Sequence, residues 1–267
     1  MKKVLGLCAA LAIAIPAAEA ADPWSIAQIN KQIDLTNMVV GDEMGGFCSG
    51  TVIDVERRLV MTAAHCTKMA WRDVQKEFVD SVTGEVTYRT IREKKELEVW
   101  HNVYRDFKLL SANHYRVKII AESYTDDMAV LQILDDQFTP PAEVKLAEAD
   151  APTRGDHVWL VSNPYVVLDN SLTEGRVSGE NRSFNFGGKN EEFFQHDAVA
   201  TEGSSGGVLI NDHGEMVGTH VRGNSSGIGL GVPVGKLKKL LISVNMRDVF
   251  DPTKSALPNP SNKMDDR

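Results

Sequence analysis

The stretch TEGSSGGVLIN, residues 201–211, places two serines among three glycines and then runs directly into an apolar segment. Glycine adopts positive φ and lets another chain approach closely, so such a cluster marks either an ordinary surface turn or a loop whose main-chain groups point at something. The residues that follow, GVLIN and then a His213-Gly214 turn, are typical of a strand and not of a helix. The stretch therefore favours an all-β fold over an α/β fold that sends a helix out of its serine loop.

Short runs rich in β-branched or alternating apolar residues recur along the chain and predict further strands. Turn dipeptides such as Thr83-Gly84 and Asn163-Pro164 separate them, which is the spacing of an all-β barrel or sandwich. The predicted strands are Gly50–Ile53, Leu59–Thr62, Tyr88–Arg92, Tyr115–Ile120, Met128–Ile133, His157–Val161, Gly175–Ser178, Glu192–His196, Val208–Ile210 and Met216–His220.

Two segments predict helices, namely Met69 to Val79 and Lys236 to Met246. In the second, apolar residues recur at i, i+3, i+4 and i+7, which is the period of one helix face. Charged residues gather between Arg72 and Arg116, so we expect this segment to form a surface loop or a set of hairpins.

Both ends of the chain have compositions that differ from the middle. Residues 1–20 combine two lysines, an apolar stretch and small residues, which is the layout of a secretory signal cleaved after Ala20. An uncleaved anchor is the alternative, with a lipid anchor on Cys8 as a weaker one. Residues 251–267 hold three prolines among polar residues and predict a disordered tail. The folded domain is then expected over residues 21–250.

Charge and cysteine content exclude several classes of function. The 267 residues carry a formal net charge of −8, and an acidic chain is a poor candidate for binding nucleic acid or anionic lipid. Without Cys8, the remaining pair Cys48 and Cys66 favours a disulfide in an oxidising compartment. A structural zinc site has four ligands, which two cysteines alone do not supply. Neither an HExxH motif nor paired CxxC motifs occur in the sequence. We therefore expect no metal and no cofactor.

Serine catalysis needs a base for the hydroxyl proton, a carboxylate that orients this base, and backbone donors for the oxyanion. The sequence offers a candidate for each part: His65 in VMTAAHC, Asp127 in TDDMAVL and Ser205 in GSSGG. Two alternatives stay open. Ser204 is the rival nucleophile, and Asp126 is the rival acid because one residue of register exchanges the faces of a strand.

Together these stretches resemble the trypsin-like serine proteases, and in particular the bacterial HtrA-like branch, here without a PDZ domain. TAAHC (62–66) is similar to the histidine motif of the family, DMAVL (127–131) to its aspartate motif and GSSGG (203–207) to its nucleophile loop. Further similarity runs through residues 158–179, 195–211 and 229–241, so the resemblance covers most of residues 45–245 apart from the charged segment between the histidine and the aspartate.

The resemblance implies two six-stranded antiparallel β-barrels of the chymotrypsin-like kind, a C-terminal helix, and a site in the cleft between the barrels. It implies peptide-bond hydrolysis through an acyl-enzyme. Ser205 would be the nucleophile, His65 the general base and then acid, and Asp127 the residue that holds the imidazole tautomer. The amides of Gly203 and Ser205 would form the oxyanion hole.

Three further expectations come from the resemblance. The Cys48–Cys66 pair is similar to the disulfide that braces the histidine loop in the animal branch, so its loss should loosen the base more than the nucleophile. Digestive members are activated when a new N-terminus pairs with an aspartate just before the serine. Ser204 occupies that place, so no such activation is expected. The match ends after one catalytic domain, so regulation through a PDZ module is not expected either.

His220, in GTHVRG, resembles the Gly-x-His of glutamyl endopeptidases and viral chymotrypsin-like proteases, where the imidazole lines the pocket for a Glu or Gln side chain. We therefore hypothesise a polar or acidic P1 preference, with Val199 and Gly223 as further pocket residues. Ala200 stands where those families tend to have a threonine. The alternative is a histidine of a strand that merely passes the cleft.

The sequence thus predicts an exported, periplasmic or secreted, serine endopeptidase that acts on proteins or peptides. It predicts no nucleic-acid partner and no stable membrane association after signal cleavage, and leaves the oligomeric state open. One alternative is a catalytically silent trypsin-like domain that serves as an adhesin, chaperone or binding module. Another is a lipase or esterase, which is disfavoured because α/β-hydrolases order their triad as Ser, acid, His.

Overall fold

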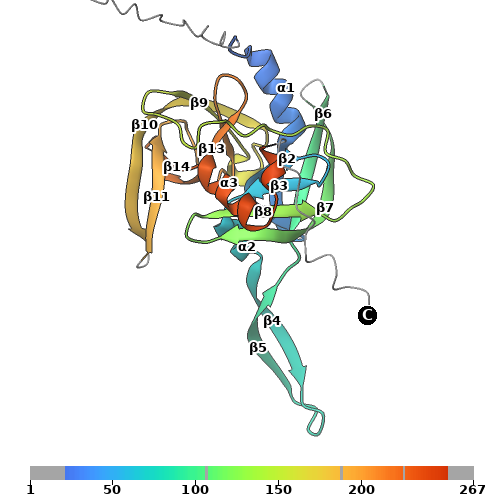
Figure 1. Ribbon diagram of the computed structural model, residues 1–267. Helices are drawn as coiled ribbons and strands as arrows, with labels where there is room; N and C mark the ends of the chain where they lie inside the picture. Colours follow the sequence, from blue (N-terminus) through green and yellow to red (C-terminus); the bar gives the residue numbers. More distant parts are fainter. Residues whose placement is uncertain (1–21, 106–107, 187–188, 225, 252–267) are drawn as a thin grey trace, which may run out of the picture.

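The computed structural model describes residues 22–105, 108–186, 189–224 and 226–251. They form two closed barrels of six strands each, followed by a helix, which confirms the predicted fold class (Figure 1). The predicted signal, residues 1–20, and all but the first residue of the predicted tail lie outside the described residues.

The first barrel contains the histidine and aspartate motifs. Around it the order of the strands is β1-β2-β3-β8-β7-β6, and neighbouring strands pair antiparallel. The strands are β1 (Asn37–Asp42), β2 (Gly45–Asp54), β3 (Leu59–Thr62), β6 (Glu98–Arg105), β7 (Lys108–Ser123) and β8 (Met128–Ile133).

The second barrel contains the serine motif. Its order is β10-β11-β14-β13-β12-β9, again antiparallel throughout. Its strands are β9 (His157–Ser162), β10 (Ser171–Phe186), β11 (Lys189–His196), β12 (Val208–Ile210), β13 (Met216–Asn224) and β14 (Ile228–Pro233), with a 3-10 helix η1 (Pro164–Val166) between β9 and β10.

Two of the α-helices pack against the barrels at the ends of the described chain. Helix α1 (Ile26–Thr36) is preceded by its N-cap Ser25, whose side chain forms a capping box with Gln28, and it buries Ile29 and Ile33. The sequence reading missed this helix, although its capping motif and apolar spacing are visible in it. Helix α3 (Val234–Ser243) confirms the predicted C-terminal helix and is followed by a 3-10 turn, η2 (Arg247–Val249). None of the helices in the described ranges is long and apolar enough to cross a lipid bilayer.

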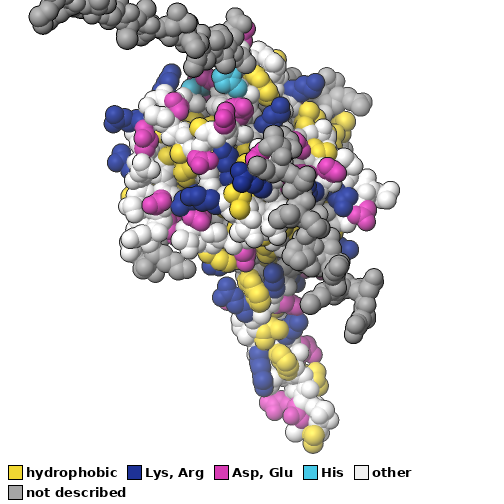
Figure 2. Space-filling model, in the orientation of Figure 1, with side chains coloured by type: hydrophobic (Ala, Val, Ile, Leu, Met, Phe, Trp, Pro, Cys, Tyr) yellow, Lys and Arg dark blue, Asp and Glu magenta, His cyan; other side chains and the backbone are white. Residues whose placement is uncertain are grey.

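A two-stranded hairpin projects from the first barrel (Figure 1). Strands β4 (Trp71–Val79) and β5 (Val86–Lys94) pair in continuous register, so the helix predicted for Met69 to Val79 is wrong. The backbone groups of β4 pair with those of β5. Asp80 closes the turn between the strands by accepting from the amides of Val82 and Thr83. Apolar side chains lie among charged ones along the hairpin (Figure 2), and its exposed apolar residues are Trp71, Phe78, Val79, Val82, Val86 and Tyr88.

Candidate active site

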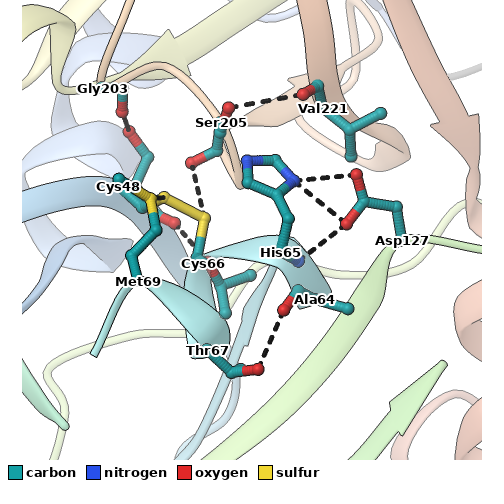
Figure 3. Close-up of a disulfide and its surroundings, with 12 residues drawn as sticks. Cys48, Ala64, His65, Cys66, Thr67, Met69, Asp127, Gly203, Ser205 and Val221 are labelled. Atoms are coloured by element: carbon teal, nitrogen blue, oxygen red, sulfur yellow. Dashed lines mark hydrogen bonds and ion pairs between the residues drawn. A yellow bond between two sulfur atoms is a disulfide. The ribbon is translucent and has the colours of Figure 1, made fainter. Parts of the chain in front are cut away.

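His65 and Asp127 contact each other at the rim of the first barrel. His65 lies in the short helix α2 (Ala64–Met69), which begins as soon as β3 ends. Its ring Nδ1 lies 2.8 and 3.0 Å from the two carboxylate oxygens of Asp127, and its backbone amide donates to Oδ1 at 2.8 Å. The carboxylate therefore fixes both the backbone and the ring of the histidine (Figure 3).

Asp127 ends the turn between β7 and β8 with a φ of 49°, a left-handed conformation that aspartate tolerates better than most residues. The residue is 2% exposed. Burial by itself would raise the pKa of Asp127, but its hydrogen bonds to His65 and the charges of His65 and Arg222 lower the pKa below its ordinary value. Asp126, the rival acid, instead accepts from the Ser123 hydroxyl at 3.0 Å and pairs with Lys236 at 3.0 Å.

A disulfide joins Cys48 of β2 to Cys66 of α2, directly after the histidine. Its Cys66 sulfur also lies 3.9 Å from the backbone oxygen of Ser205, so the bridge contacts both the histidine helix and the serine loop (Figure 3). A ring nitrogen of His65 and the two sulfurs lie within 4.8 Å of one another. Because the sulfurs are bonded to each other and are not thiolates, they do not form a metal-ligand set while the disulfide is intact.

The two serines of the loop have different surroundings. Ser204 is fully buried, where its oxygen accepts from the Ser162 hydroxyl at 3.2 Å and from the Thr201 amide at 3.3 Å. Ser205 is half-buried and lies on the side of the imidazole that faces away from Asp127 (Figure 3). In the described part of the chain its hydroxyl donates to the Val221 oxygen at 3.3 Å and not to His65.

The glycines on either side of the serines are required by the backbone. Gly203 has φ +88°, and a Cβ there would lie 2.5 Å from the Asn163 oxygen. Gly206 has φ +83°, and a Cβ there would lie 2.1 Å from the Ser49 oxygen. The positive φ and the close backbone oxygens both exclude a side chain larger than glycine's hydrogen at these two positions. This explains why glycines surround the two serine hydroxyls.

Three carbonyl groups of the loop accept hydrogen bonds from donors in other parts of the chain. The Glu202 oxygen accepts from the Tyr165 amide at 2.6 Å, the Gly203 oxygen from the Ser49 hydroxyl at 2.8 Å, and the Ser205 oxygen from the Ser49 amide at 2.8 Å. Among the described residues, the amides of Gly203 and Ser205 themselves have no acceptor. Ser49, which the sequence reading missed, thus joins β2 of the first barrel to the serine loop of the second.

A cleft of about 760 Å³ adjoins Ser205. His220 and Gly223, two of the three predicted pocket residues, line it, whereas Val199 is 64% exposed and lies outside its lining. His220 is buried, and its Nδ1 lies 3.0 Å from Nε2 of His196. Burial lowers the pKa of His220 to about 3 and that of His196 to about 4, so both imidazoles are neutral at neutral pH.

Arg222 is a further cleft residue that the sequence reading did not select. One of its guanidinium nitrogens lies 3.8 Å from the Asp127 carboxylate and 3.3 Å from the Glu191 carboxylate. No local signal marked this arginine, which shares its strand with the polar residues Thr219, His220 and Asn224. Its partners come from distant parts of the chain, so the spacing alone could not identify them.

Three comparisons place this geometry among known proteins. The family model described as "Trypsin-like peptidase domain" matches residues 48–218. The periplasmic serine endoprotease DegP of Salmonella typhimurium is 31% identical over 138 residues, and that of Escherichia coli K12 is 30% identical over 138 residues. Each alignment covers 50% of this chain but only 28% of the relative.

A solved structure also superposes on the chain. The apo form of the MamO protease domain from Magnetospirillum magneticum gives a TM-score of 0.58 at 15% identity, covering 78% of this chain and 96% of that one. At this identity the likeness supports the fold alone.

Proposed function

We propose, on the premise that this chain belongs to the family of trypsin-like peptidase domains, that it is a serine endopeptidase acting on protein or peptide substrates. His65, Asp127 and Ser205 would be its catalytic residues. The observation that carries the proposal is the His65–Asp127 pair, with Nδ1 at 2.8 and 3.0 Å from the carboxylate and with Ser205 on the opposite side of the ring (Figure 3).

The chemistry follows from which ring nitrogen is engaged. Because Nδ1–H donates to Asp127, Nε2 carries the lone pair and can accept the proton of Ser205 once that hydroxyl turns away from Val221. The serine oxygen then attacks the scissile carbonyl and forms the acyl-enzyme, while the imidazolium returns its proton to the leaving amine. Asp127 stabilises this cation and holds the ring orientation.

The developing negative charge on the carbonyl oxygen needs donors that are already oriented. The amides of Gly203 and Ser205 fit this role, since the carbonyls of the same two peptide groups, Glu202 and Ser204, accept from the amides of Tyr165 and Gly207. Removing one such donor typically raises the barrier by about 3–4 kcal/mol. Ser204 would support the loop through its buried hydroxyl, in the place where digestive enzymes carry an activating aspartate.

Export of the protein is supported by three independent features. Residues 1–20 have the composition of a secretory signal. The Cys48–Cys66 disulfide fits an oxidising compartment. The two DegP relatives are named as periplasmic. We therefore assign the domain to the periplasm or to the secreted fraction.

For specificity we propose that His220 favours a Glu or Gln side chain at P1. A neutral imidazole on the wall of the cleft can exchange a hydrogen bond with a polar side chain, and its contact with His196 fixes the ring. Thr201, Arg222 and Asn224 add polar groups to the same cleft, beside the apolar Ile228 and Leu230.

Labelling with a fluorophosphonate tests the proposed nucleophile. We expect the purified domain to react, Ser205→Ala to lose labelling and turnover without a change in melting temperature, and the matched control Ser204→Ala to keep labelling. An unreactive parent, under conditions that label a control protease, would instead support a silent binding module. Labelling lost in Ser204→Ala and kept in Ser205→Ala would identify Ser204 as the nucleophile and overturn the assignment of Ser205.

Peptides that vary only at P1 test the pocket. We expect a Glu or Gln advantage that disappears in His220→Ala, with Val199→Ala as control because Val199 lies outside the cleft lining. A parent that prefers Val or Ala would overturn the specificity proposal and leave the endopeptidase proposal intact. Mass spectrometry of products from a denatured protein digest would extend the result to natural sequences.

A further inference from the structure

Two adjacent acids of the first barrel are each linked through a cation to one of two adjacent acids of the second barrel. One of these two ion-pair bridges lies behind the site, and the other lies at the surface. The inner bridge is Asp127–Arg222–Glu191, with separations of 3.8 and 3.3 Å, and the outer bridge is Asp126–Lys236–Glu192, with separations of 3.0 and 3.3 Å. In each bridge the acids come from the turn before β8 in the first barrel and from β11 in the second. The two bridges therefore run in parallel between the barrels.

Burial separates the two bridges. The side chains of Asp127 and Glu191 are 3% and 7% exposed, while Asp126 and Glu192 in the outer bridge are 31% and 67% exposed. Buried carboxylates need a compensating cation, because an unpaired buried charge is strongly unfavourable. Exposed ion pairs contribute little and are screened by salt. A functional effect is therefore expected of the inner bridge and not of the outer one.

We propose that Arg222 is a positioning residue of the active site: its guanidinium compensates the buried charge of the Asp127 carboxylate, holds that carboxylate in place for His65, and links it to Glu191 of the second barrel. This inference rests on the proposed function of His65 and Asp127. Asp127 would then orient His65, and Glu191 would hold the guanidinium that supports Asp127. Through this series of contacts the alignment of the imidazole would depend on how the two barrels pack against each other.

The sign of the effect follows from the charges around the imidazole. Asp127 contacts the ring from the β7–β8 turn; from β13, His220 interacts with His65 electrostatically, and Arg222 lies 3.8 Å from the Asp127 carboxylate. Farther out lie Glu191 on β11, Glu122 on β7 beside Thr67, and the outer-bridge residues Asp126, Lys236 and Glu192. The positive charge of Arg222 disfavours the imidazolium, and the negative charge of Glu191 partly offsets Arg222. Removing the charge of Arg222 should therefore favour the imidazolium of His65, and removing the charge of Glu191 should disfavour it.

The experiment follows the titration midpoint of the His65 ring by NMR in a Ser205→Ala background, which prevents self-digestion. We expect Arg222→Gln to raise the midpoint by about 0.5–1 pH unit and Glu191→Gln to lower it. Arg222→Lys should stay close to the parent because it keeps the charge. Lys236→Gln is the matched control from the outer bridge and should shift the midpoint much less than Arg222→Gln, because its partners are more exposed.

Kinetics with intact Ser205 give the second readout. Arg222→Gln should lower kcat at neutral pH by about tenfold with little change in KM, and move the acid limb of kcat/KM upward with the NMR midpoint. Indistinguishable midpoints in Arg222→Gln, Glu191→Gln and the parent, or shifts of the same sign, would overturn the inference. If Arg222→Gln does not fold, Glu191→Gln still decides it, because a midpoint that does not fall in that variant would overturn the inference. A parent that titrates as expected but does not react with fluorophosphonate would reject only the proposed function.

Discussion

The two barrels contribute to the site in different ways. The first barrel provides a histidine and an acid that are already in contact, at 2.8 Å between Nδ1 and the carboxylate, and a disulfide directly after that histidine. The second barrel provides a loop in which Gly203 and Gly206 adopt positive φ and Ser205 donates to the Val221 oxygen at 3.3 Å. The proposed acid–base half is thus assembled through side chains, and the proposed nucleophile half through the backbone.

This difference indicates which changes each half tolerates. A side-chain pair such as His65 and Asp127 fails when one functional group is replaced, even if the backbone keeps its course. The loop around Ser205 fails when a Cβ is added, because Gly203 and Gly206 have backbone oxygens within 2.5 Å of the position that a Cβ would take. Substitutions in the two halves should therefore break activity by distinguishable routes.

The largest effect is expected from the acid of the first barrel. Asp127→Asn should lower kcat by about 10⁴-fold with an unchanged fold, because an amide stabilises the wrong imidazole tautomer. Asp126→Asn is the matched control, since its side chain faces Ser123 and Lys236. Pre-steady-state acylation rates measure both variants. Equal losses in the two would contradict the assignment of Asp127.

Next comes the backbone of the second barrel. Gly203→Ala should lower kcat/KM by about 10²–10³-fold, because the added Cβ displaces an amide aimed at the developing oxyanion. Gly84→Ala controls for backbone strain, since Gly84 has φ +72° at the hairpin tip with nothing within 4 Å of the added Cβ. The comparison would fail if both alanine variants lost the same activity.

Removing the disulfide should act on stability more than on chemistry. The bond closes a sequence separation of 18 residues, and loss of a loop of this size should lower the free energy of unfolding by about 3 kcal/mol in the chain-entropy model. The test is urea unfolding of the Cys48→Ala, Cys66→Ala double variant. The contact between Cys66 and Ser205 adds an expectation absent from the sequence reading, namely slower fluorophosphonate labelling as well as a looser histidine. An unchanged unfolding midpoint would reject the brace.

The smallest effect is expected from pH acting on the second barrel. The pKa values of His196 and His220 lie near 4 and 3 in the fold and at 6.5 in the unfolded chain. The unfolded chain therefore binds protons first as the pH falls, so stability from these groups is fully present well above pH 6.5 and is lost downward. From about pH 6.5 to about pH 5.5 the loss should be on the order of 2 kcal/mol. Urea unfolding of the parent and of His196→Gln at these pH values measures this loss. If the free energy of unfolding fell equally with pH in both proteins, the assignment of the loss to His196 would be contradicted.

Local patterns allowed much of the fold to be predicted. Strands β3, β8 and β12 have the bounds expected from their apolar runs, because side chains that alternate or fill a barrel interior leave a clear signal. The hairpin strand β4 was missed, since WRDVQKEFV is stabilised by its partner β5 and exposes most of its side chains. The sequence also predicted the three candidate catalytic residues from their motifs, while Ser49, Glu191 and Arg222 had no local signal.

From the sequence came an all-β fold, with the two barrels implied by the family resemblance, and also the serine-centred chemistry to test and the glycines that such a loop requires. The sequence left open which of two adjacent serines and which of two adjacent acids would face the histidine. Tertiary structure distinguishes them, burying Ser204 against Ser162 and turning Asp127 toward His65. It also pairs Arg222 with acids of both barrels. The physical reason is that orientation and pairing of side chains depend on strand register and barrel contact, which join residues far apart in the chain.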